Sequence, residues 1–83
     1  MSKTISAVVD YCSEQYDQHI DKERPYALAF ASVLFRAVFL ANTKPDPESE
    51  LTAWLNRPHV DQDLLRVCQL VLEKFQNLAA LPA

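Results

Sequence analysis

The chain has 83 residues, of which 49% are hydrophobic, and its formal net charge is −3. A chain of this length makes one domain, residues 1–83, and its apolar content is too high for a disordered segment. Its eight basic residues do not cluster beyond Lys22 and Arg24, so the sequence lacks the run of positive charge that is typical of nucleic-acid-binding proteins.

The complete lack of glycine is the most informative feature of the composition. Tight β-hairpin turns depend on glycine because it tolerates positive φ. Phosphate-binding loops, dinucleotide-binding fingerprints and nucleophile elbows need it for the same reason, or for a close approach of the backbone to a phosphate. The sequence therefore predicts an all-α protein and excludes most nucleotide-dependent enzymes.

Prolines at positions 25, 45, 47, 58 and 82 divide the chain into four segments of helical length. In residues 4–20 the apolar side chains share one arc of about 120° at helical spacing; they are Ile5, Val8, Val9, Cys12, Tyr16 and Ile20. Asp10, Glu14 and Asp17 form an acidic stripe on the opposite side, and Ser2 or Thr4 is suited to cap the start. We expect an amphipathic helix whose acidic stripe faces solvent or a basic partner.

Residues 25–42 are apolar almost all round, which is typical of a helix that is buried on most sides. One side carries Tyr26, Phe30, Val33, Leu34, Ala37 and Leu40, and the other carries Leu28, Phe35, Val38 and Phe39. This segment is a poor membrane span, because its apolar stretch is about 16 residues where a bilayer needs about 20, and Arg36 interrupts it. We expect Arg36 to pair with a carboxylate or with carbonyl groups at a polar edge.

The third segment, residues 47–56, predicts a short helix that Asp46 caps and Pro47 begins. Its single apolar stripe consists of Leu51, Trp54 and Leu55.

The fourth segment, residues 62–80, has the clearest helical pattern, with Asp61 as its N-cap and Val60 placed to pack on Leu65. Its apolar arc consists of Leu64, Leu65, Val67, Cys68, Val71, Leu72, Phe75, Leu78 and Ala79. Leu70 lies toward the polar side. Together the four segments predict a compact bundle of about four helices with the largely apolar second helix at its centre.

The histidines and cysteines do not form a recognisable catalytic or metal site. His19 lies two helical turns from Cys12, too far for a direct hydrogen bond, and we expect it to be partly buried. We expect His59 to be solvated and both Cys12 and Cys68 to be buried, reduced thiols. The sequence predicts no enzyme activity, no cofactor and no metal, and a cytoplasmic protein with no secretory segment at its start.

Three functional hypotheses are compatible with this pattern. The first is a non-enzymatic module that binds another protein; the second is a DNA-binding regulator with a helix-turn-helix at residues 47–70; the third is an enzyme or a carrier of a small ligand. Asp61 and Asp63 would repel phosphates at the start of a recognition helix, so we favour the first and expect no nucleic-acid or membrane partner.

The predicted interface is the second side of the central helix. Leu28, Phe35 and Phe39, with Leu70, are its candidate residues, and we expect a homodimer, because a two-fold dimer is the commonest way to cover such a surface. The acidic stripe of Asp10, Glu14 and Asp17 is the other candidate surface.

Overall fold

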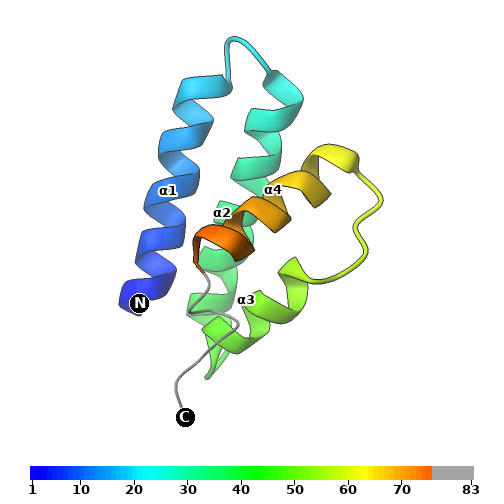
Figure 1. Cartoon of the computed structure of the whole chain (residues 1–83). Helices are drawn as coiled ribbons and strands as arrows, with labels where there is room; N and C mark the ends of the chain where they lie inside the picture. The colour runs from blue at the N-terminus through cyan, green and yellow to red at the C-terminus, as the bar shows by residue number, and fades with distance from the viewer. Residues whose placement is uncertain (76–83) are drawn as a thin grey trace.

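The computed structural model describes residues 1–75 and has four helices and no strand in that range. The helices are α1 (Lys3–His19), α2 (Arg24–Thr43), α3 (Pro47–Leu55) and α4 (Gln62–Lys74). The first two form an antiparallel pair, α4 crosses that pair, and α3 lies at the end of α2 that leads into it (Figure 1). The predicted all-α bundle is confirmed.

Three of the four helices begin at the polar residue that the sequence predicts. The Ser2 hydroxyl accepts a hydrogen bond of 3.1 Å from the backbone N–H of Ile5, and the Asp46 carboxylate accepts one of 3.3 Å from Ser49. Asp61 accepts two, at 2.8 and 3.1 Å, from the first turn of α4. These side chains satisfy N–H groups that have no partner within the helix, and this fixes where each helix starts.

The core is built around α2, which contacts each of the other three helices. Its buried side chains are Tyr26, Ala27, Ala29, Phe30, Val33, Ala37 and Leu40. Against them pack Ile5, Val8 and Cys12 of α1, Leu51 and Leu55 of α3, and Val67, Cys68 and Val71 of α4. The predicted central position of the second helix is therefore confirmed.

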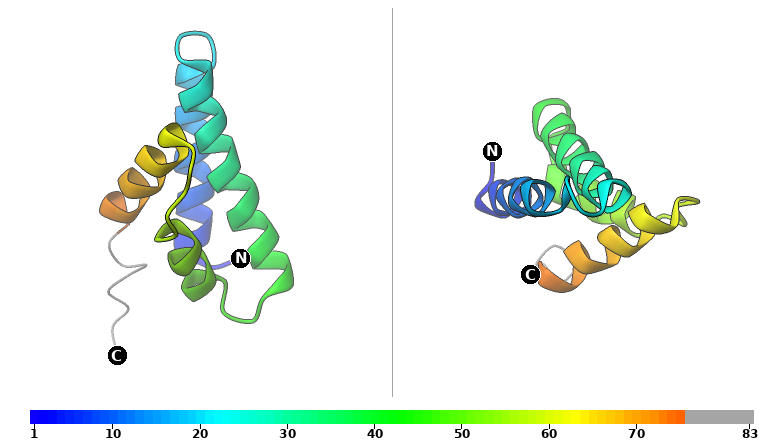
Figure 2. Two further views of the ribbon diagram at one scale, coloured as in Figure 1. Left: turned by 90° about the vertical axis from the view of Figure 1, so that its right-hand side faces the viewer. Right: turned by 90° about the horizontal axis from the view of Figure 1, so that it is seen from above.

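The bundle covers α2 on one side only. Figure 2 shows that α3 and α4 lie on the same side of the α1–α2 pair and that no described helix covers the opposite side. There Leu28 is 49% exposed, Phe35 69% and Phe39 52%. The helix α2 thus has one face in the core and one apolar face in solvent.

By length and composition α2 could also cross a membrane; among residues 1–75 it is the single helix for which this holds. The most apolar 18-residue stretch of this 20-residue helix has a mean hydropathy of 1.5, and 39% of that stretch is buried within the bundle. The core helix of a soluble protein passes the same test, so this property does not separate the two cases.

Two expectations for the connection between α3 and α4 are wrong. Val60 is 94% exposed, so it does not pack on Leu65. His59 is partly buried, with its Nε2 2.9 Å from the carbonyl oxygen of Trp54 and its ring 4.8 Å from the Trp54 ring. His59 takes the inward position in this connection, which leaves its neighbour Val60 in solvent.

The end of the predicted fourth helix is described only in part. The structure ends α4 at Lys74 and places Phe75 at its C-cap. Leu78 and Ala79, which we expected on its apolar arc, lie outside the described residues.

Two phenylalanines of α2 test the division of this helix into a buried and an exposed face. Phe30 has no exposed surface and Phe35 is mostly exposed. We expect Phe30→Leu to lower the free energy of unfolding by about 1 to 2 kcal/mol, because it leaves a space in the packed core. The matched change Phe35→Leu should alter it by less than about 0.5 kcal/mol. Urea melts followed by circular dichroism measure both, and equal losses would contradict the assignment of faces.

Candidate protein-binding surface

Three exposed side chains form an apolar ridge along α2, which we call the α2 ridge: Leu28, Phe35 and Phe39. At 100° per residue they lie within about 40° of one another around the helix axis. Contiguous exposed apolar side chains of this size mark interaction sites on soluble proteins. The structure therefore places three of the four apolar interface residues predicted from the sequence on one line.

Leu70, the fourth predicted residue, is not part of this line. It is partly buried on α4 and lines a shallow hollow with Tyr26, Arg66 and Glu73. The structure does not bring it to the α2 ridge, because α4 crosses α2 on the covered side. The predicted acidic stripe of α1 is present as an exposed surface: Asp10, Glu14 and Asp17 are all exposed.

On its α1 side, the α2 ridge borders a hollow without charged residues. Ser13 and Tyr16 of α1 form one wall, and Leu28, Ala31, Leu34 and Phe35 of α2 form the other. This flank extends the apolar surface of the ridge.

On its other side, the ridge borders three hollows that follow one another along α2 and share lining residues. We call them together the lateral groove. Its middle is lined by Ser32, Phe35, Arg36, Phe39, Trp54 and Leu64. Arg24, Pro25, Leu28, Ala29 and Asp61 extend it toward the start of α2, and Leu40, Thr43, Lys44, Glu50 and Arg57 extend it toward the end.

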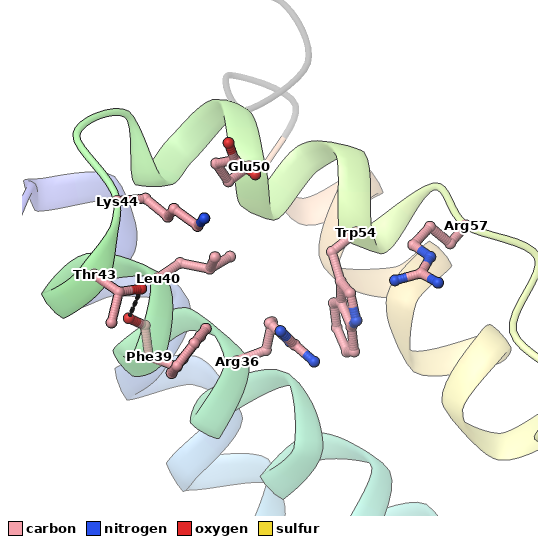
Figure 3. Close-up of a pocket in the computed structure, with 8 residues that line it drawn as sticks. All are labelled: Arg36, Phe39, Leu40, Thr43, Lys44, Glu50, Trp54 and Arg57. Atoms are coloured by element: carbon pink, nitrogen blue, oxygen red, sulfur yellow. Dashed lines mark hydrogen bonds between the residues drawn. The ribbon is translucent and has the colours of Figure 1, made fainter.

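Arg36 is held between two aromatic rings in this groove. Its guanidinium carbon lies 5.3 Å from the centre of the Trp54 ring and 5.6 Å from that of Phe39. Arg36 and Trp54 point toward each other across the gap between α2 and α3 (Figure 3). Within residues 1–75 this guanidinium has no carboxylate or carbonyl partner, so the expected pairing is wrong; cation–π contacts take its place.

The remaining reactive residues lie in the core. Burial raises the pKa of the Cys12 thiol to about 12, with the neighbouring Cys68 adding to the shift, and burial raises the pKa of Cys68 to about 11. Both thiols are free and, being neutral at physiological pH, are poor nucleophiles. His19 is partly buried, as predicted, with its ring 5.0 Å from that of Tyr26. No group of three potential metal ligands occurs in the described part of the chain.

Comparisons with protein-family models, with curated proteins and with solved structures find no similar protein. A proposal for the function of this chain therefore has to be based on the ridge and the lateral groove.

Sequence patterns reveal the ridge, because its residues lie on one helix. The groove escapes them, because its walls combine residues of α2, α3 and α4.

The cation–π contact can be measured with a double-mutant cycle. We expect Arg36→Met and Trp54→Leu to show a coupling energy of about 0.5 to 1 kcal/mol in urea melts, because the charge lies over the ring face. As the control, Arg57→Met should couple with Trp54→Leu by less than about 0.3 kcal/mol, since Arg57 lines the same hollow without such a contact. Equal coupling in both cycles would show that the Arg36 contact adds nothing specific.

Proposed function

We propose that this protein is a small non-enzymatic module that binds another protein through the α2 ridge. The observation that carries the proposal is the exposure of Leu28, Phe35 and Phe39 on a single helix. Burying aromatic and aliphatic side chains of this kind typically provides most of the energy of a protein interface. Leaving these three side chains in solvent means that a chain of this size does not use their burial to stabilise its fold.

The ridge supplies part of the energy that a stable complex requires. Covering the exposed parts of its three side chains contributes about 3 to 5 kcal/mol, which is comparable to the lower estimates of the cost of association. A partner that binds with useful affinity therefore also contacts the flanks of the ridge. Both the hollow beside α1 and the lateral groove are open for this.

The two alternative functions, an enzyme and a DNA-binding regulator, have less support. The buried, neutral thiols are unsuited to nucleophilic catalysis. A DNA-binding role for α3 and α4 is disfavoured by Asp61 and Asp63 at the start of α4, where a recognition helix contacts the major groove. The free cysteines suit a reducing compartment, and we propose the cytoplasm.

The homodimer predicted from the sequence would use the same face. A two-fold pairing of α2 with α2 of a second copy covers the ridge of both molecules. When the two α2 helices run antiparallel, this pairing also sets the basic side chains along one lateral groove near those of the other, which opposes close association. We therefore place a different protein ahead of a second copy as the partner.

Replacing Phe35 with glutamate tests the proposed function. We expect tagged wild-type protein to retain a partner from the lysate of its native cells, and Phe35→Glu to lose it, because a charge then replaces an anchor of the ridge. Gln18→Glu is the matched control, since it adds the same charge at an exposed position of α1 and should retain the partner.

Circular dichroism should show that all three proteins keep their helical content. Retention of the same partner by Phe35→Glu would exclude the ridge as the binding surface. Light scattering on the purified wild type reports separately whether the protein forms a dimer. The same measurement on Phe35→Glu reports whether the variant dissociates it.

A further inference from the structure

We infer that the partner segment is an acidic amphipathic helix that lies along the α2 ridge and places a carboxylate on Arg36. This inference rests on the proposed function and names the chemical class of its partner. The evidence is the charge of the lateral groove, the state of the Arg36 side chain and the shape of the surface.

The charge of the groove is opposite to that of the whole protein. Four of the chain's eight basic residues line it: Arg24, Arg36, Lys44 and Arg57. Only two of the eleven acidic residues do so, namely Glu50 and Asp61. The groove therefore carries a positive charge on a protein with a net charge of −3, and it attracts a negatively charged partner while the rest of the surface repels it.

Arg36 is prepared to receive a carboxylate. A guanidinium has five N–H donors at its edge, and none of those of Arg36 is used within residues 1–75. The guanidinium carbon lies over the rings of both Phe39 and Trp54, and these contacts restrict the position of the group. A carboxylate can then form two parallel hydrogen bonds with the free edge, and little side-chain entropy is lost when it binds.

The shape of the surface suits a helix. The α2 helix has 20 residues and is about 30 Å long, and the ridge and the groove follow it over most of that length. An extended segment would need hydrogen-bond partners for its backbone, and the described residues have no strand edge to supply them. A helix satisfies its own backbone groups and can present apolar anchors on one face with carboxylates at its border.

Two other occupants are less consistent with these features. A nucleic acid would use the basic residues, but it would leave the apolar ridge without a suitable contact and would face Glu50 and Asp61. A second copy with its α2 antiparallel would cover the ridge but bring the basic residues of the two grooves together. Both remain measurable outcomes.

The test is a selection from a displayed library of random peptides, with the full-length protein as bait. We expect the enriched peptides to combine apolar residues at helical spacing with a net negative charge. A synthetic copy of an enriched peptide should gain helical circular dichroism on binding. Its affinity should fall by about tenfold or more between about 0.05 and 0.5 M NaCl, because exposed charges are screened over this range.

Charge reversals locate the binding site of that peptide. Lys44→Glu with Arg57→Glu should weaken binding by about tenfold or more, and so should Arg36→Met, while Arg36→Lys should have an intermediate effect because it keeps the charge but loses the two-point geometry. Lys3→Glu with Lys22→Glu is the matched control: it changes the net charge equally at exposed positions outside the groove and should change affinity less than about twofold.

The failures are distinguishable. If the selected peptides require Phe35 but show no acidic bias and no dependence on Arg36, the ridge binds proteins and the inferred partner class is wrong. If no peptide depends on Phe35, the proposed function fails as well. Tight, groove-dependent binding of a fluorescent single-stranded oligonucleotide, or a dimer in light scattering that Phe35→Glu dissociates, would overturn the inference in favour of that occupant.

Discussion

The structure depends on a mismatch between the apolar surface of α2 and the helices available to cover it. This helix is apolar almost all round, yet α3 has only 9 residues and lies with α4 on one side of the α1–α2 pair. The covered side holds Phe30 with no exposed surface, and the other side leaves Phe35 in solvent. In a domain this small, hydrophobic burial barely exceeds the entropy lost on folding. A half-covered central helix therefore has a stability cost, which the proposed binding to another protein would offset.

The same arrangement explains why the ridge and the positive charge lie side by side. Arg36 is next in the chain to the exposed Phe35, and the turn of the helix directs it toward α3, where Trp54 meets it. Lys44 follows the end of α2 and Arg57 follows the end of α3, and both line the same part of the lateral groove. Local sequence therefore places the apolar side chains of the α2 ridge on one line, and tertiary packing brings the basic residues beside them.

The sequence predicts most of the fold because its signals are local. Ser2, Asp46 and Asp61 cap the helices they precede, and the periodicity of α2 separates the buried Phe30 from the exposed Phe35. The wrong expectations for Arg36 and Leu70 concern contacts between helices, and those for His59 and Val60 concern the connection between α3 and α4. Arg36 meets an aromatic ring on α3 instead of a carboxylate, His59 turns inward to Trp54, and Leu70 faces away from the ridge. No spacing along the chain encodes how α3 and α4 are placed on α2, so neither these contacts nor the lateral groove could be derived from it.

The most direct test of the central claim, that one face of α2 is free in the isolated protein, is hydroxyl-radical footprinting read by mass spectrometry. At concentrations where light scattering shows a monomer, Phe35 and Phe39 should be oxidised at rates close to those in the urea-unfolded chain. Phe30, on the same helix, should be oxidised at about a tenth of that rate or at a lower rate, because it is accessible only when the structure opens. Protection of Phe35 equal to that of Phe30 would contradict the account, since the second face of α2 would then belong to the core.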